Sequence, residues 1–242
     1  MTSPAVSADP ARRPESVAPR ADRGAQPMFD WLFLLSVAVV AAAVIRAMAF
    51  TPTEINQGDA QKIYYVHVPA ALSAYLALGI AAVMSIIYLW LHDERADRLA
   101  ESATEVGFVF TTGVLLTGPL WGKPIWGAWW TGDARQNLTL FLWFVTAAYL
   151  VLRGAVDDPG MRGRYSAVLA VLAALLIPFI HLSVYLFRTM HPMPIVLKPD
   201  RPSLPGEMLT TWVIAVIAFG FFGITLIRAR YRLSLLREAA DR

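Results

Sequence analysis

A dense run of tryptophans is the segment of this chain best suited to chemistry. Four of the eight tryptophans fall within ten residues, and an acidic and a basic residue follow them. These residues are Trp121, Trp126, Trp129, Trp130, Asp133 and Arg135. An indole ring offers a flat apolar face and one N–H donor, so the cluster can stack along a planar macrocycle or anchor at lipid headgroups. Interleaved glycines favour the macrocycle because they let rings and backbone approach a flat partner closely; they are Gly122, Gly127 and Gly132.

Membrane helices must position these side chains. Hydrophobic residues make up 57% of the 242 residues and charged residues only 16%, whereas soluble domains have about 25% charged residues. A helix crosses the hydrocarbon layer with about 20 mostly apolar residues. Four stretches satisfy this length, and two shorter or more polar ones flank the tryptophan run. We therefore predict an all-α integral membrane protein with six transmembrane helices, at 28–50, 68–91, 99–120, 138–152, 165–187 and 208–227.

Three regions follow from this pattern. Residues 1–27 are rich in proline, alanine and arginine, and we expect a disordered cytoplasmic leader. Residues 28–227 form the membrane domain, with an outer loop at 121–137, and residues 228–242 form a basic cytoplasmic tail. The first apolar run exceeds the roughly 7 to 15 residues of a signal-peptide core, so it should remain as a helix.

The distribution of lysine and arginine predicts the orientation. With both termini in the cytoplasm, fourteen of these residues lie inside and six outside, which satisfies the positive-inside rule. The excess positive charge, +3 in total, then lies at the cytoplasmic lipid surface, so nucleic-acid binding is not needed to explain it. The outer segments are 51–67, 121–137 and 188–207, and they contain the tryptophan run, His67 and His191. We expect the function to reside on this outer face.

The sequence WGKPIWGAWWTGDAR at 121–135 closely resembles the WWD motif of the haem-handling proteins of cytochrome c biogenesis, the family of CcmC, CcmF and CcsA. The six-span layout, with the motif between the third and fourth spans, is most similar to the CcmC type. The resemblance covers about residues 28–227. The chain departs from the family pattern at Gly132 and at the pair Gln136 and Asn137, behind the tryptophans.

The resemblance implies two axial ligands to haem iron, one at the start of the second helix and one after the fifth. His67 and His191 match these positions. It further implies that the tryptophans, with Asp133 and Arg135, hold haem b. A CcmE-type haem chaperone would receive the haem, with the ABC-type complex CcmAB and the small membrane protein CcmD as neighbours, in the bacterial inner membrane. The chain would itself catalyse no bond formation, and having no cysteine it cannot attach haem by a thioether.

Several other residues compete for roles in such a site. His181 lies within the fifth span and is an alternative axial ligand, since an intramembrane histidine is a functional candidate. Four basic residues could pair with haem propionates, because a guanidinium group matches carboxylate geometry. They are Arg46, Lys123, Arg135 and Arg188, and Arg135 is preferred because it adjoins the tryptophans. Asp133 is expected to orient Arg135 or a ring N–H.

Two other functions remain open at this point. A b-type cytochrome subunit would need histidines facing one another from inside the spans, and only His181 lies inside one. A haem-free scaffold or transporter would use the tryptophans as an aromatic belt and would give His67 and His191 no special role. The sequence favours haem delivery over both.

Overall fold

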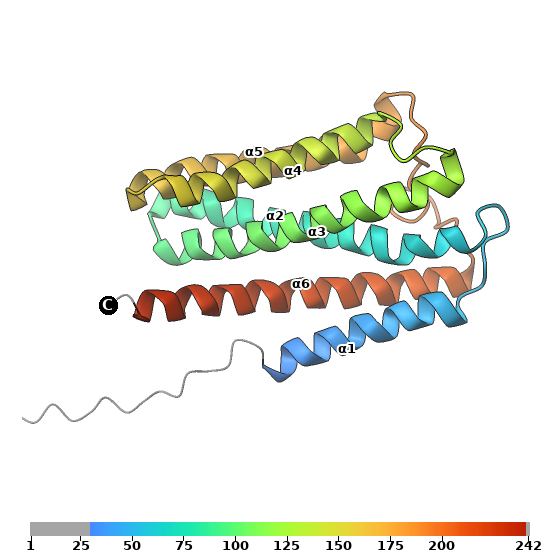
Figure 1. Ribbon diagram of the computed structural model, residues 1–242, viewed down its shortest axis with the longest axis horizontal. Coiled ribbons are helices and arrows are strands. Elements are labelled where there is room, and N and C mark those ends of the chain that lie inside the picture. Colours follow the sequence, from blue (N-terminus) through green and yellow to red (C-terminus); the bar gives the residue numbers. More distant parts are fainter. Residues whose placement is uncertain (1–29, 241–242) are drawn as a thin grey trace, which may run out of the picture.

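The computed structural model describes residues 30–240, which form a bundle of six long helices (Figure 1). All six are long and apolar enough to cross a membrane, so the prediction of an all-α protein with six candidate spans is confirmed. The leader expected at 1–27 lies outside the described residues. In chain order the helices are α1 (Trp31–Ile45), α2 (Tyr64–Leu91), α3 (Glu94–Trp126), α4 (Ala134–Ala155), α5 (Pro159–Leu186) and α6 (Gly206–Ala240). A π-helical turn at Arg46–Phe50 continues α1 and completes the first candidate span, and a short 3-10 helix at Asp59–Ile63 precedes α2.

Aspartates begin four of these helices. Asp30, Asp93, Asp133 and Asp158 each accept a hydrogen bond from a backbone N–H of the first turn, which satisfies a donor that the helix itself leaves without a partner. Asp93 and Asp158 are the last residues of short connections: residues 92–93 join α2 to α3, and residues 156–158 join α4 to α5. These tight turns lie at one end of the bundle, and the long connections lie at the other (Figure 1).

Helix α2 lies at the centre and packs against α3, α5 and α6. Small residues bring α2 and α3 close together: a Cβ atom on Gly107 would lie 2.7 Å from Leu78, so only glycine fits there. Helix α1 packs chiefly against α6. Within that pair, the buried hydroxyls of Ser36 and Thr225 are 2.8 Å apart.

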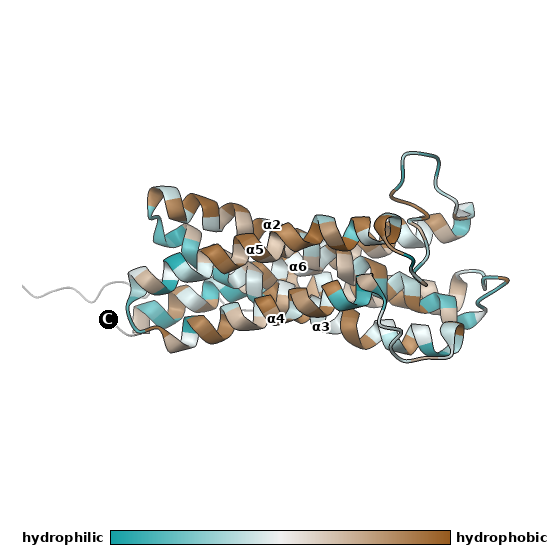
Figure 2. Cartoon of the chain, turned by 90° about the horizontal axis from the view of Figure 1, so that it is seen from above, coloured by the Kyte–Doolittle hydropathy of each residue, from teal (hydrophilic) through white to brown (hydrophobic). Residues whose placement is uncertain are grey.

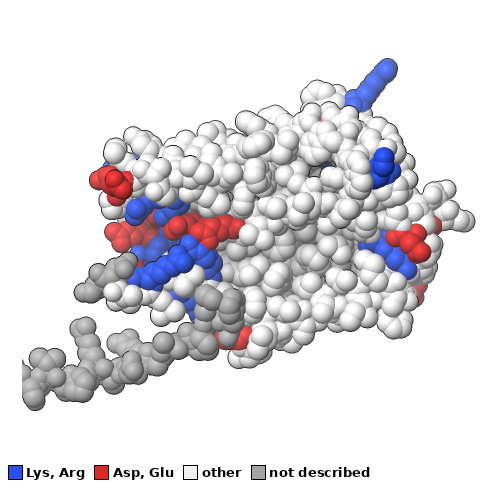
Figure 3. All heavy atoms as spheres, viewed as in Figure 1, with Lys and Arg blue, Asp and Glu red and all other residues white. Residues whose placement is uncertain are grey.

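Charged side chains gather at the end of the bundle where α6 ends, and the middle is almost free of them (Figure 3). Arg153 of α4 binds Asp97 and Glu101 of α3 at 2.8 and 3.0 Å. Arg230 of α6 binds Glu105 of the same α3 face. Hydropathy follows the same division, with hydrophobic residues along the middle and polar ones toward the ends (Figure 2). The acidic residues that made the third span look weak are therefore ion-paired between helices.

Five of the six helices extend past their expected limits, and α3 and α6 do so most. Helix α3 begins at Glu94, before the predicted start at 99, and helix α6 continues to Ala240 through most of the expected basic tail. In this extension Arg228 and Arg232 both bind Asp30, at 2.9 and 2.7 Å. The start of α1 and the late part of α6 thus lie together. Residues 228–240 are helical, buried or half-buried up to Ser234 and mostly exposed beyond it.

Helix also replaces much of the loop expected at 121–137. Helix α3 runs through Trp126, and α4 begins at Ala134, so only residues 127–133 are non-helical. Trp121 and Trp126 consequently stand on the last turns of α3, whereas Trp129 and Trp130 belong to the loop. The tryptophan run is divided between a rigid and an irregular element.

Candidate haem site

A cavity of about 920 Å³ lies at the end of the bundle opposite the ion pairs. Its size falls within the roughly 300 to 1,000 Å³ of small-molecule sites. Six of the predicted site residues line it, namely His67, His191, Trp121, Trp126, Trp130 and Arg135. Trp129 and Asp133 are not among the lining residues. The walls come from α2, α3, α4, α5 and α6 and from the connections between α1 and α2, α3 and α4, and α5 and α6.

His67 stands on the first turn of α2 and faces α3. Its Nδ1 lies 2.8 Å from the hydroxyl of Thr117. That hydroxyl donates its own proton to the carbonyl of Gly113, at 2.8 Å, so it acts as acceptor toward the imidazole. We therefore assign the ring proton to Nδ1, which leaves the Nε2 lone pair free to bind a metal.

His191 lies in the connection between α5 and α6 and is held in the same way by Asp133. Its Nδ1 is 3.1 Å from Oδ1 of Asp133, and a carboxylate can only accept, so Nδ1 donates. The carboxylate also accepts from the hydroxyl of Thr189 and, at 2.9 Å, from the backbone N–H of Met190. No hydrogen bond within residues 30–240 involves Nε2 of either histidine.

Burial sets the protonation of this pair. Burial lowers the pKa of the His191 imidazole, and the neighbouring Asp133 offsets only part of that shift. Burial alone would raise the pKa of Asp133, but hydrogen bonds from Thr189, Arg135 and Met190 hold that pKa below its usual value. At neutral pH the pair is thus a neutral imidazole beside an ionised carboxylate, the form in which histidine binds metals.

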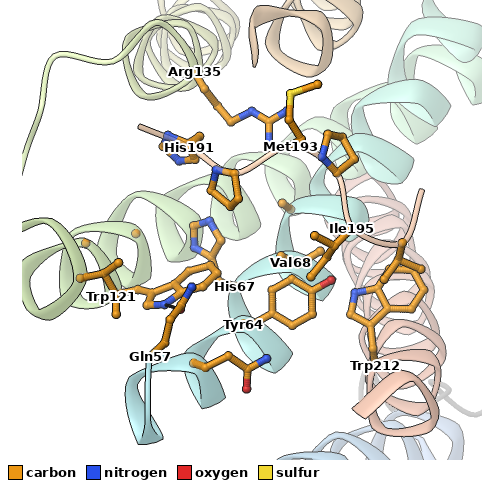
Figure 4. Close-up of a pocket in the computed structure, with 18 of the residues that line it drawn as sticks. Gln57, Tyr64, His67, Val68, Trp121, Arg135, His191, Met193, Ile195 and Trp212 are labelled. Carbon is orange, nitrogen blue, oxygen red and sulfur yellow. Dashed lines mark hydrogen bonds between the residues drawn. The ribbon is translucent and has the colours of Figure 1, made fainter. Parts of the chain in front are cut away.

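Each histidine has a tryptophan beside it. The ring centroids of Trp121 and His67 are 5.9 Å apart, and those of Trp126 and His191 are 5.0 Å apart. Trp121 is fixed by its N–H, which donates to Oε1 of Gln57 at 3.0 Å. Figure 4 shows Trp121 next to His67, with His191 and Arg135 on the other side of the cavity.

Trp129 does not line the cavity. Its side chain is 56% exposed, and the ammonium of Lys123 lies 5.9 Å from its ring centroid. The interleaved glycines also have a different role from the one expected. A Cβ on Gly122 would lie 3.0 Å from the Trp126 ring, and Gly127 and Gly132 have positive φ angles of 75° and 71°. They let Trp126 lie against its own helix and allow the turns of the loop.

Arg135 is the only one of the four proposed propionate-binding residues that lines the cavity. Its guanidinium donates to the carbonyls of Ile180 and His181 on α5, at 3.3 and 3.1 Å. The sequence suggested that Asp133 orients Arg135 or a ring N–H. Asp133 does not bind this guanidinium; it accepts from the backbone N–H of Arg135 and from the ring N–H of His191. Arg46 instead pairs with Glu207 at 3.4 Å. His181 also lines the cavity, so its alternative role as a ligand stays open.

Sequence reasoning missed the supporting residues Thr117, Thr189, Gln57 and Gln136. Thr117 lies fifty residues from His67, and no local pattern links them. Gln136 was open to prediction, because an aspartate followed three residues later by glutamine is a typical helix start. Its side chain accepts from the backbone N–H and the hydroxyl of Thr131, at 3.0 and 2.8 Å, and so fixes the loop that carries Trp130.

Comparison with known proteins identifies relatives along most of the chain. A family model described as "Heme exporter protein C" matches residues 16–242. Heme exporter protein C of Haemophilus influenzae is 32% identical over 216 residues, which cover 89% of this chain and 87% of that protein. The protein of the same description from Bradyrhizobium diazoefficiens is 36% identical over 215 residues, or 87% and 80% of the two chains. A putative cytochrome c biosynthesis ccmC-like mitochondrial protein of Marchantia polymorpha is 30% identical over 187 residues, or 77% and 78%.

Proposed function

Since the chain belongs to the heme exporter protein C (CcmC) family, we propose that its cavity binds haem b on the outer face of the membrane and delivers it to a haem chaperone. Family membership makes the chain a multi-pass membrane protein that handles haem in cytochrome c maturation, an assembly factor and not an enzyme. The binding residues, the receiving partner and the side of the membrane are the proposed parts.

The pairing of His67 and His191 carries the proposal. The two residues come from separate elements, line one cavity, and each have Nδ1 occupied by a hydrogen-bond acceptor. Both therefore offer Nε2 to an iron atom. No group of three histidine, cysteine or acidic side chains that could hold a bare metal ion occurs in the described part of the chain. Two imidazoles suit an iron whose other four ligands come from a porphyrin.

The other predicted residues fit haem in distinct ways. Trp121, Trp126 and Trp130 supply flat apolar walls, and Arg135 supplies a positive charge for a propionate. Asp133 supports His191 without lining the cavity, and the exposed Trp129 contributes at the surface. Haem brings the iron, and this chain supplies the ligands, the walls and the orientation.

The bundle is proposed to lie in the bacterial inner membrane with both termini in the cytoplasm. The ion-paired end, where α6 ends with several arginines, would then face the cytoplasm, and the cavity would open on the outer side. A CcmE-type chaperone would receive haem there, with CcmAB and CcmD as membrane neighbours. The Ccm system is the setting that the family name implies.

Optical spectra test this proposal. The full chain is purified in mild detergent, loaded with haem, and compared with His67→Ala, His191→Ala and His181→Ala. We expect a six-coordinate low-spin spectrum for the wild type, its loss in the first two variants and its retention in the third. Loss only in His181→Ala would favour a b-type cytochrome, and the absence of any Soret band after haem addition would refute haem binding.

A further inference from the structure

The two proposed axial histidines have unequal hydrogen-bond partners. Nδ1 of His191 donates to the carboxylate of Asp133 at 3.1 Å, whereas Nδ1 of His67 donates to the hydroxyl of Thr117 at 2.8 Å. A carboxylate that accepts an imidazole N–H makes the opposite nitrogen a stronger donor to a metal. A neutral hydroxyl does so far less. Nε2 of His191 should therefore be a stronger donor to a metal than Nε2 of His67.

Asp133 is well suited to strengthen its histidine. Its side chain is only 2% exposed, so water does not weaken its hydrogen bonds. Three of its donors come from consecutive residues of one loop: the Thr189 hydroxyl, the Met190 N–H and the His191 ring. A fourth is the backbone N–H of Arg135, at the start of α4. One carboxylate thus fixes the loop ligand to a helix.

The surroundings of His67 lack an equivalent group. The proton of the Thr117 hydroxyl is already donated to the Gly113 carbonyl. Among the described residues that line the cavity, the only acid is Glu54. Its carboxylate accepts from the backbone N–H groups of Asn56 and Gln57 in its own turn, at 2.8 and 2.5 Å. Among the described residues, no hydrogen bond joins it to His67, whose ring nitrogen Nδ1 is bound to Thr117.

We propose that Asp133 and Thr117 are positioning residues that make the two iron bonds unequal, so that His191 retains the iron while His67 dissociates first. This inference rests on the proposed function and concerns the order of release at the same site. A carrier built in this way can open one coordination position, on the side of α2 and α3, without losing its haem. A ligand atom of the receiving partner would enter at that position.

Carbon monoxide binding tests the order of release. CO can bind ferrous haem in the full chain only after one histidine leaves, so the rate at saturating CO measures dissociation of the weaker ligand. Thr117→Val removes the hydroxyl at nearly constant shape and should raise this rate roughly fivefold, the equivalent of about 1 kcal/mol for one hydrogen bond. Thr117→Ser keeps the hydroxyl and should react like the wild type. Asp133→Asn should raise the rate less than Thr117→Val does, because an amide acceptor leaves His191 about as weak a ligand as His67 and not weaker. A larger increase in Asp133→Asn than in Thr117→Val would overturn the proposal.

Resonance Raman spectra of the single-histidine variants test the strength of each bond separately. Ferrous His67→Ala retains only His191, and ferrous His191→Ala retains only His67. The iron–imidazole stretching frequency should be higher in His67→Ala than in His191→Ala. Adding Asp133→Asn to His67→Ala should lower this frequency, whereas adding Asp133→Glu should leave it nearly unchanged. Adding Thr117→Val to His191→Ala should change little. Equal frequencies in the two single variants would refute the inequality, even if Asp133→Asn failed to fold.

Failure of the inference is distinguishable from failure of the proposed function. If the wild-type spectrum does not show two imidazole ligands, the ligand pair is wrong and the order of release is refuted with it. If that spectrum is present but the CO rates or the frequencies show the reverse order, only the inference is refuted.

Discussion

Replacing Trp126 with alanine should weaken haem retention much more than the same change at Trp129. The Trp126 ring lies 5.0 Å from His191, centroid to centroid, and lines the cavity, and such an aromatic contact contributes about 1 kcal/mol. Burying about 50 Å² of the indole against a flat ligand, at about 25 cal/mol per Å², adds roughly 1 kcal/mol. The sum of about 2 kcal/mol corresponds to a roughly 30-fold weaker Kd.

The matched control is Trp129→Ala, which removes an identical ring three residues away. That ring is 56% exposed and does not line the cavity, so the Kd should change less than about twofold, within surface substitution effects. Both variants are purified in detergent, and haem loss is followed at the Soret band with an apo-globin as acceptor. Equal haem loss from the two variants, or greater loss from Trp129→Ala, would show that the cavity is not where the macrocycle binds.

Two further predictions concern stability. Arg153→Met should lower the free energy of unfolding by about 2 kcal/mol, because it leaves the partly buried Asp97 without its cation and leaves Glu101 with only the longer pairing to Arg230, at 3.9 Å. Thermal unfolding in detergent measures this loss, and a changed haem affinity in the same variant would contradict the separation of the two ends. As pH falls below the ordinary histidine pKa of about 6.5, the haem-free protein should become less stable, since burial lowers the pKa of His191 and hydrogen bonds lower that of Asp133. In both cases the unfolded chain binds protons at higher pH than the folded chain. His191→Gln should therefore reduce the dependence of the melting temperature on pH between pH 5 and about 6.5.

Much of the fold could be predicted because hydropathy is a local property. Six apolar runs gave six helices, and the two connections expected to be short and charged, at 92–93 and 156–158, are short turns that contain aspartate. The limits of α3 and α6 could not be found in this way. Their charged ends are stabilised by partners far along the chain, such as Glu105 with Arg230 and Asp30 with Arg232. A rule that counts charges in a window treats these residues as the end of a span.

The candidate site shows the same division between local and distant information. Residue type and family resemblance were enough to select His67, His191 and the tryptophans, and the structure brings five of these six residues to one cavity. The sequence suggested that Asp133 orients Arg135 or a ring N–H, but it could not say which ring, because that ring belongs to His191, 58 positions away. Trp129 and Trp130 are adjacent in sequence, yet only Trp130 lines the cavity. This difference depends on the backbone of the turn between α3 and α4.

The pairing of α1 with α6 has a consequence for the order in which the protein is made. Ser36 and Thr225, whose hydroxyls meet between these helices, are 189 positions apart. At about 5 to 20 residues per second, the ribosome takes roughly 10 to 40 s to reach the partner of the first helix. During that time α1 lies in the lipid without α6, its main partner, and Asp30 lacks Arg228 and Arg232, which bind it in the complete fold. The first helix to be synthesised is thus among the last to be docked, and a chain truncated before α6 would leave it without its main partner.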